Sequence, residues 1–190
     1  MTINCDTYHL VIGLGRSGQS MAKYLLATGK RVVGTDIDPS KTDAAEKLNA
    51  LGIPTQIGFH DQETFDNAAV LVPSPGIPPT LSYIQTAAEK GVPVESELDI
   101  FYKANTLPVV AITGTNGKTT TTTLIAEMLD ACGYRPFVCG NIGTPLVEMF
   151  LTSETYDVVV AEVSSFQMDI SRRFKPDVGV LLNISEDHLD

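Results

Sequence analysis

The 190-residue chain has 13 Lys and Arg against 23 Asp and Glu, a formal net charge of −10, and 43% of its residues are hydrophobic. The acidic balance argues against a nucleic-acid partner, which needs a basic face, and the apolar content suits one large or two small globular domains. No apolar run reaches about 18 residues and no basic, apolar leader opens the chain, so we expect no membrane insertion.

Strand-like apolar runs alternate with helix-like segments in the first half of the chain, a pattern typical of a parallel sheet in an α/β fold. We predict strands at 9–12, 31–36, 55–57, 69–72 and 92–94. We also predict three helices, the first ending near residue 27, the second at 41–51 and the third at 81–90. Residues 1–105 are therefore predicted to form an N-terminal Rossmann-like domain with a parallel sheet.

A new buried strand begins at Val109, after the polar stretch 104–108. Beyond it we predict a helix to about residue 131, strands at 137–138, 157–163 and 178–183, and a helix at 145–151. Residues 106–190 are thus predicted to form the first part of a second α/β domain of the P-loop type. Because a doubly wound domain rarely ends soon after such a strand, we expect the chain to be the front part of a longer protein.

The most informative run is GTNGKTT, between the strand at Val109 and the next helix. Glycines let backbone N–H groups turn toward an anion, and the helix N-terminus behind them adds its positive dipole end. Lys118 can bridge the outer phosphates and Thr119 can hold Mg²⁺. The loop is a short variant, because Ile112 stands where the standard spacing has its first Gly. The predicted phosphate-binding residues are Gly114, Thr115, Asn116, Gly117, Lys118, Thr119 and Thr120.

A second glycine loop follows the opening strand, as Gly13-x-Gly15-x-x-Gly18, and Asp36 ends the next strand. This is the dinucleotide fingerprint, with a tight turn, a close backbone approach to a pyrophosphate, and an acid for a ribose hydroxyl. The motif alone can hold NAD, another nucleotide diphosphate, or no nucleotide, and the choice stays open at this point.

Polar residues follow the ends of four other predicted strands. Ser74-Pro-Gly76 is either part of a ligand site or a plain turn. Glu162 can bind Mg²⁺ directly or through water, or it can serve as a helix cap or a buried ion pair. His188 is a candidate metal or substrate ligand, although a single His is usually structural. Asn141 can bond a phosphate or sugar, or it can simply suit its Gly-rich turn.

Together these motifs resemble the Mur ligase family, ATP-dependent enzymes that add amino acids to the peptidoglycan precursor. The resemblance spans essentially the whole chain and is carried by GLGRSG, SPGIP, ITGTNGKTT, and GNIG together with AEVSSFQM and NISEDHLD. ITGTNGKTT also occurs in folylpolyglutamate synthases, whereas EVSSFQM beside SPGIP and GNIG is most similar to the members that add D-glutamate. The resemblance implies a ligase that joins D-glutamate to UDP-N-acetylmuramoyl-L-alanine through an acyl phosphate.

The resemblance also implies which residues act. The N-terminal domain would bind the UDP part of the substrate rather than NAD. The implied UDP-substrate contacts are Arg16, Ser17, Asp36, Ile37, Ser74, Pro75, Gly76, Asn141, Ser164 and His188. Relatives often carry other side chains at Arg16 and Ile37, so contacts there are expected to be through the backbone or to differ in detail. Residues 114–120 would hold the ATP phosphates, Thr119 and Glu162 one Mg²⁺, and His188 a second. Lys118, Glu162 and His188 are the implied catalytic residues.

Family members also use a carbamylated lysine and a C-terminal domain, neither of which we find in these 190 residues. We therefore expect the isolated chain to show little or no ligase activity. Two other hypotheses stay open. An NAD-dependent oxidoreductase would explain the first glycine loop but not GTNGKTT, and a nucleotide-binding module without turnover would explain both.

The sequence also predicts the cellular compartment and the oligomeric state. Three scattered cysteines, Cys5, Cys132 and Cys139, form no paired framework, which is typical of a reducing compartment. We expect a cytoplasmic monomer.

Overall fold

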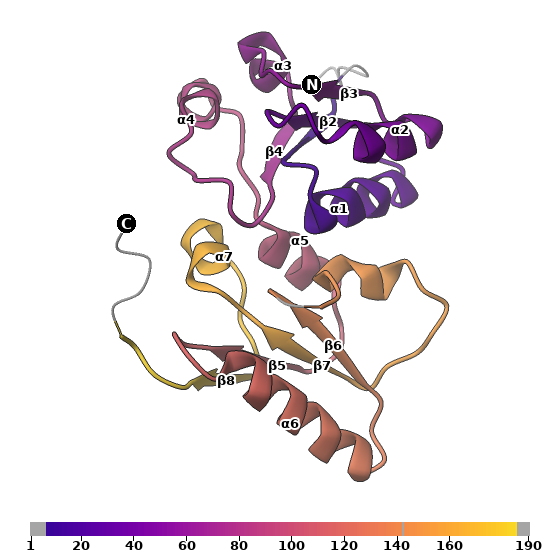
Figure 1. Ribbon diagram of the computed structural model, residues 1–190, viewed down its shortest axis with the longest axis vertical. Coiled ribbons are helices and arrows are strands. Elements are labelled where there is room, and N and C mark those ends of the chain that lie inside the picture. Colours follow the sequence, from indigo (N-terminus) through magenta and orange to yellow (C-terminus); the bar gives the residue numbers. More distant parts are fainter. Residues whose placement is uncertain (1–6, 142, 186–190) are drawn as a thin grey trace. The chain divides into compact units, whose positions relative to one another are not determined.

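Parallel β-sheets organise both halves of the chain, as the alternation of apolar runs and helical segments predicts (Figure 1). The computed structural model describes residues 7–141 and 143–185. The chain divides into two compact units, Met1–Glu97 and Leu98–Asp190. The expected α/β class, with a parallel sheet in each half, is thus confirmed.

The sheet of the first unit has the strand order β3-β2-β1-β4 and is entirely parallel. Its strands are β1 (His9–Ile12), β2 (Val32–Asp36), β3 (Thr55–Ile57) and β4 (Val70–Pro73), and its helices are α1 (Arg16–Ala27), α2 (Thr42–Ala50), α3 (Gln62–Asp66) and α4 (Ser82–Glu89). The predicted strand at 92–94 is reduced to a single bridge between Leu71 and Val94.

Burial of Leu10, Val11 and Ile12 explains why these three residues of β1 are all apolar. Leu10 and Ile12 pack with Phe65 of α3 and Ile84 of α4 on one face. Strand β2 pairs with one edge of β1, and β4, which comes later in the chain, pairs with the other edge of β1. The loops after β1 and β4 therefore flank a switch point, where ligands of open α/β sheets bind.

The sheet of the second unit has the order β6-β7-β5-β8. Its strands are β5 (Val109–Thr113), β6 (Pro136–Gly140), β7 (Val158–Glu162) and β8 (Val178–Leu181), and its helices are α5 (Glu97–Ala104), α6 (Lys118–Ala131), the 3₁₀ helix η1 (Leu146–Phe150) and α7 (Ser165–Ile170). Ala126 of α6 packs on Ile112 and Val160 of the central strands. All four strands thus carry their carboxyl ends to one edge of the sheet, beside the start of α6.

Helix α5 lies at the division between the two compact units. The predicted boundary at 105/106 lies at the C-terminal end of this helix, whereas the two units divide in its first turn. The physical reason is packing, because the Phe101 ring lies 5.7 Å from that of Phe150 and the Asp99 carboxylate binds backbone groups of 172–174.

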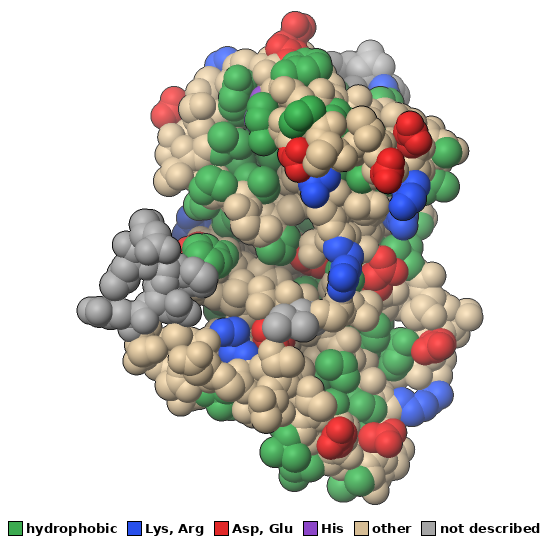
Figure 2. Space-filling model, in the orientation of Figure 1, with side chains coloured by type: hydrophobic (Ala, Val, Ile, Leu, Met, Phe, Trp, Pro, Cys, Tyr) green, Lys and Arg blue, Asp and Glu red, His purple; other side chains and the backbone are tan. Residues whose placement is uncertain are grey.

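None of the helices in the described part of the chain has the length and apolar character needed to cross a membrane. On the face shown in Figure 2, Lys and Arg side chains are scattered among acidic ones.

Candidate functional site

The loop between β5 and α6 has the backbone that its glycines predict. Gly114 has φ 140° and Gly117 has φ 87°, both in the region that favours glycine. A Cβ on Gly114 would lie 3.0 Å from the backbone oxygen of Asn183, so the loop approaches the segment after β8 closely. Helix α6 begins at Lys118. Its positive N-terminal end therefore faces the loop, as anion binding requires.

Asn183 holds the loop from the end of the neighbouring strand. Its Oδ1 accepts the N–H of Asn116 at 2.9 Å, and its Nδ2 donates to the Asn116 carbonyl at 2.9 Å. The Thr115 N–H donates to the Asn183 carbonyl at 3.1 Å. Our sequence reasoning missed Asn183, although a polar residue just past a strand beside the phosphate loop was an available signal.

Lys118 folds back over the loop that precedes it. Its Nζ donates to the carbonyl of Gly114 at 2.6 Å and to that of Thr115 at 2.9 Å. These contacts hold the ammonium charge beside the glycine backbone. A polyphosphate placed against the loop would meet both the cation and the helix N-terminus.

Glu162 is the buried acid of this edge, with 2% of its surface exposed. Its Oε2 accepts the Thr119 hydroxyl at 2.8 Å, and its Oε1 accepts the Asn141 amide at 3.0 Å. Two residues predicted on separate segments, Thr119 and Asn141, thus meet at the carboxylate of a third.

The Thr119 hydroxyl and the Glu162 carboxylate fit Mg²⁺, since both are hard oxygen donors and lie in contact. Within 7–141 and 143–185, no three His, Cys, Asp or Glu side chains gather into a metal cluster. Mg²⁺ commonly takes one or two protein oxygens together with phosphates and water, so a two-residue donor set is sufficient.

The phosphate loop, Lys118 and Asn141 border one pocket of about 550 Å³, whereas Thr119 and Glu162 are not among its lining residues. It is lined by Thr113, Gly114, Thr115, Lys118, Asn141, Ser164, Ser165, Phe166, Leu181, Asn183, Ile184 and Ser185. A larger hollow of about 720 Å³ lies between α6 and β6 in the same unit and contains none of the predicted site residues. Arg135, a lining residue of this hollow, already contacts Asp157 and Thr155. The lining also includes the acidic residues Glu127 and Asp130. We therefore assign the chemistry to the smaller pocket.

Ser164 caps α7 at the wall of this pocket. Its Oγ accepts the Gln167 N–H at 3.3 Å, and its own N–H donates to Gln167 Oε1 at 2.9 Å. This is a capping box. Gln167 was missed, although the Ser-x-x-Gln spacing is the signature of that motif. His188, predicted as a catalytic, metal and substrate residue, lies outside the described residues.

The glycine loop of the first unit is closed by contacts from two strand ends. A Cβ on Gly18 would lie 1.9 Å from the Gly13 carbonyl oxygen, so only glycine fits there. The Ser74 hydroxyl donates to the same carbonyl at 2.6 Å. Ser17, Ser74 and Pro75 border one small hollow. The loops after β1 and β4 therefore meet as the switch-point topology requires.

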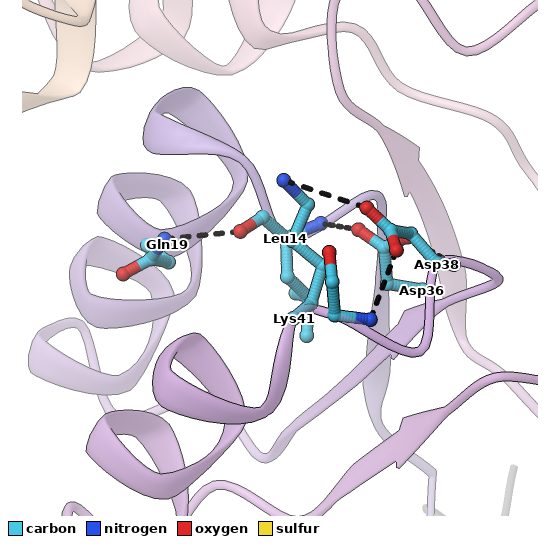
Figure 3. A network of polar contacts seen from close by, with 6 residues as sticks. Leu14, Gln19, Asp36, Asp38 and Lys41 are labelled. Carbon is cyan, nitrogen blue, oxygen red and sulfur yellow. Dashed lines mark hydrogen bonds and ion pairs between the residues drawn. The ribbon is translucent and has the colours of Figure 1, made fainter.

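Asp36 holds the glycine loop of the first unit through hydrogen bonds to the backbone. Its Oδ2 accepts the Leu14 N–H at 2.6 Å and its Oδ1 accepts the Asp38 N–H at 2.9 Å (Figure 3). Gln19 donates from the following helix to the Leu14 carbonyl at 3.0 Å. A carboxylate has further lone pairs for a ribose hydroxyl, so both roles are compatible. Of the other predicted contacts, Arg16, Ile37 and Gly76 are exposed.

His60 lies behind the end of β2. Its Nδ1 is 2.9 Å from the Thr35 hydroxyl, and its ring meets those of Phe65 and Tyr83 edge-on at 5.4 Å. Burial lowers the pKa of His60, and the charge of Asp36 partly opposes that shift. The surroundings of the ring thus disfavour a charged imidazole near the end of the strand that carries Asp36.

Comparisons with known proteins match both units. Residues 7–96 match the Mur ligase MurD-like N-terminal domain, and residues 112–190 match the Mur ligase middle domain. A UDP-N-acetylmuramoylalanine–D-glutamate ligase of Desulfosudis oleivorans is 47% identical over 182 residues, which cover 95% of this chain and 40% of that protein. The corresponding ligase of Geobacter metallireducens is 46% identical over 183 residues, again 95% and 40%. The chain thus spans about 40% of the length of these curated relatives.

Solved structures agree with the fold. The UDP-N-acetylmuramate-alanine ligase MurC of Thermotoga maritima aligns with a TM-score of 0.57 at 25% identity, over 96% of this chain and 42% of that one. A UDP-N-acetylmuramate:L-alanyl-gamma-D-glutamyl-meso-diaminopimelate ligase of Neisseria meningitides aligns with a TM-score of 0.60 at 22% identity, over 97% and 63%, and shows the likeness of fold alone. With both of its units matched, the chain belongs to the Mur ligase family and carries a MurD-like N-terminal domain followed by a middle domain.

Proposed function

We propose that the protein to which this chain belongs is an ATP-dependent, amide-bond-forming ligase that joins D-glutamate to UDP-N-acetylmuramoyl-L-alanine in peptidoglycan precursor synthesis. The observation that supports this most is the meeting of Lys118, Thr119 and Glu162 at one phosphate loop. Its context is a chain 47% identical to a curated D-glutamate ligase. The cytoplasmic location and the monomeric state stay predictions from the sequence.

In this proposal the second unit holds ATP. The backbone of 114–117 and the N-terminus of α6 bind the phosphates, and Lys118 exchanges its loop carbonyls for phosphate oxygens. Thr119 and Glu162 would hold Mg²⁺, which when bound spreads the negative charge of the transferring phosphoryl group. His188, as a second metal ligand and substrate contact, belongs to the same proposal.

The first unit binds the UDP-linked substrate. Its glycine loop would approach the diphosphate, with Ser17, Ser74 and Pro75 around it and Asp36 at the end of β2. Arg16, Ile37 and Gly76 complete the proposed set. Asn141 and Ser164 are proposed to reach the substrate from the second unit.

The reaction then follows in two steps. The free carboxylate of the L-alanine attacks the γ-phosphate of ATP, which forms an acyl phosphate and releases ADP. The amine of D-glutamate attacks that carbonyl, a tetrahedral intermediate collapses, and phosphate leaves. The first step brings two anions together, so Lys118 and the amides of the loop must cancel charge as well as orient the phosphates.

Calorimetry on this chain tests the division of labour. Lys118→Ala should weaken binding of a non-hydrolysable ATP analogue by about tenfold or more, because a charge-assisted contact to phosphate is lost. Binding of UDP-N-acetylmuramoyl-L-alanine should stay unchanged. Lys175→Ala removes an exposed cation of the same unit and should change neither affinity.

Three results would contradict the proposal. Loss of UDP-substrate binding in Lys118→Ala would mean that the two sites are assigned to the wrong units. Tight binding of NADH without binding of the uridine nucleotide would favour an oxidoreductase. For the full-length protein, release of ADP with another amino acid but not with D-glutamate would exclude the proposed acceptor.

A further inference from the structure

Asn141 contacts Glu162 at two points. Its side-chain Nδ2 donates to Oε1 of the buried carboxylate at 3.0 Å, and its backbone N–H donates to the Glu162 carbonyl at 2.8 Å. Thr119 donates to the other carboxylate oxygen at 2.8 Å. Each oxygen of this carboxylate therefore has its own donor, one from the phosphate-loop helix and one from the turn after β6.

The direction of the Asn141 amide follows from the chemistry of its partner. An ionised carboxylate only accepts hydrogen bonds, so it must be met by the amide nitrogen. The opposite orientation of the amide would place two acceptors in contact. Asn141 is itself exposed, whereas Glu162 is 2% exposed, so the exposed amide supplies a donor to a buried oxygen.

The backbone places Asn141 at this carboxylate. Gly140 stands opposite Glu162 in the register of β6 and β7, with φ 114°. A Cβ there would lie 2.0 Å from the Glu162 carbonyl oxygen, so the two strand ends approach without a side chain between them. The Gly140 N–H donates to the Thr144 carbonyl at 2.9 Å, which closes the turn on the other side.

We infer that Asn141 is a positioning residue for the Glu162 carboxylate, which keeps Oε2 beside the Thr119 hydroxyl where the metal of the proposed function would bind. This inference rests on that proposed function. Without the Asn141 amide, the buried Oε1 would lose its hydrogen-bond donor. The Glu162 carboxylate would then rotate toward a different donor. The main effect of Asn141 is therefore on the metal, through Glu162, and its contact with the UDP-linked substrate is secondary.

The test separates these two roles. Mn²⁺ is titrated into the chain saturated with a non-hydrolysable ATP analogue and followed by electron paramagnetic resonance, and UDP-N-acetylmuramoyl-L-alanine is titrated separately. Asn141→Ala should weaken Mn²⁺ binding about 10- to 100-fold, the usual effect of removing a group that orients a ligand. The affinity for the UDP-linked substrate should stay within about twofold, well under one tenfold step.

A second variant and a control complete the design. Asn141→Ser keeps a donor on a shorter side chain, and its Mn²⁺ affinity should fall between those of the wild type and Asn141→Ala. If the Ala variant does not fold, Asn141→Ser should still bind Mn²⁺ more weakly than the wild type while keeping its affinity for the UDP-linked substrate. Asn105→Ala removes an amide side chain that bonds the backbone of Leu107 within its own loop, and should change neither affinity.

The outcomes are distinct. A weakened affinity for the UDP-linked substrate with unchanged Mn²⁺ binding would overturn the inference and make Asn141 a substrate contact. Unchanged values for both ligands would also overturn it. If the wild-type chain binds no ATP analogue with Mn²⁺, the proposed function fails at this site irrespective of Asn141.

Discussion

Gly140 shows how much one absent side chain contributes to the site. Its positive φ of 114° and the 2.0 Å that would separate an added Cβ from the Glu162 carbonyl oxygen are two separate obstacles to any other residue. Gly133 has a positive φ of 87° but nothing within 4 Å of such a Cβ. Comparing substitutions at the two glycines therefore separates the cost of backbone strain, which both share, from the cost of steric overlap, which only Gly140 has.

We expect Gly140→Ala to lower the free energy of unfolding by about 2–6 kcal/mol, the sum of about 1–3 kcal/mol of backbone strain and about 1–3 kcal/mol of overpacking. Gly133→Ala should cost only the strain, about 1 kcal/mol. Urea denaturation of both variants measures the difference. Equal losses would mean that the ends of β6 and β7 can separate easily.

His60 makes the stability of the first unit depend on pH. Burial lowers its pKa in the folded state, so the unfolded chain binds more protons as the pH falls below about 6.5. The free energy of unfolding should therefore be lower at pH 5.5 than at pH 7.5, because this interval spans the ordinary histidine pKa of about 6.5. His9, whose pKa is also lowered by burial, acts in the same direction.

Replacing His60 by Gln tests its share of this effect. His60→Gln keeps a polar group near Thr35 and removes the titration, so it should lose less stability than the wild type over the same pH interval. Urea unfolding at both pH values measures the two losses, and the NMR titration of the His60 ring should give a pKa below about 6.5. An equal loss in both proteins would assign the pH dependence to other groups.

At the scale of elements, α5 is tied to the second unit by one buried carboxylate. Asp99 is 4% exposed and accepts the N–H groups of Arg172, Arg173 and Phe174 at 2.8–3.2 Å. It also accepts the Ser171 hydroxyl at 2.8 Å. These groups follow α7 directly, so Asp99 fixes the turn that links the pocket wall to β8.

Asp99→Ala should lower the free energy of unfolding by about 3 kcal/mol, because several backbone donors lose a charged acceptor at once. Ser171→Ala removes one of the four donors and should cost about 1 kcal/mol. Chemical denaturation gives both values, and hydrogen exchange at residues 172–174 should become faster in Asp99→Ala. Similar losses in the two variants would show that the backbone contacts contribute little.

The three helices that sequence reasoning missed are all short. Helices α3, α5 and α7 have five, eight and six residues. Such lengths give few turns over which an apolar period can repeat, and they are held by tertiary contacts more than by propensity. Helix α6 was predicted despite its run of threonines, because glycine, lysine and a buried strand mark its start.

At the scale of the whole chain, the two units should be separable at the start of α5. A fragment of residues 98–190 keeps the Asp99 contacts and the Phe101–Phe150 ring pair, whereas a fragment of residues 106–190 loses both. We expect the longer fragment to unfold at a temperature about 10 °C higher or more, since the lost contacts amount to several kcal/mol and about 1 kcal/mol corresponds to 4–8 °C for a domain of this size. Circular dichroism measures both transitions.

The first unit provides the complementary measurement. Residues 1–97 should stay monomeric, whereas residues 1–105 carry the fully buried Phe101 without its ring partner Phe150 in the second unit. The longer fragment should therefore aggregate more, as light scattering would show. Equal behaviour of the two fragments, together with equal melting of 98–190 and 106–190, would place the boundary at 105/106 instead.

The sequence by itself determined the α/β class, the two glycine loops and the family resemblance, because each depends on local spacing: Gly13 to Gly18 after one strand, Gly114 to Lys118 after another. The resemblance already implied that Thr119 and Glu162 share a metal, whereas only the tertiary structure shows the hydrogen bonds that Thr119 and Asn141 make with Glu162. Asn141 and Thr119 are far from Glu162 in the chain, and they reach it because parallel pairing brings the ends of β5, β6 and β7 to one edge. Hydrogen bonds between distant segments leave no periodic trace in the sequence, so the partners of Glu162 and Asp99 had to be read from the fold.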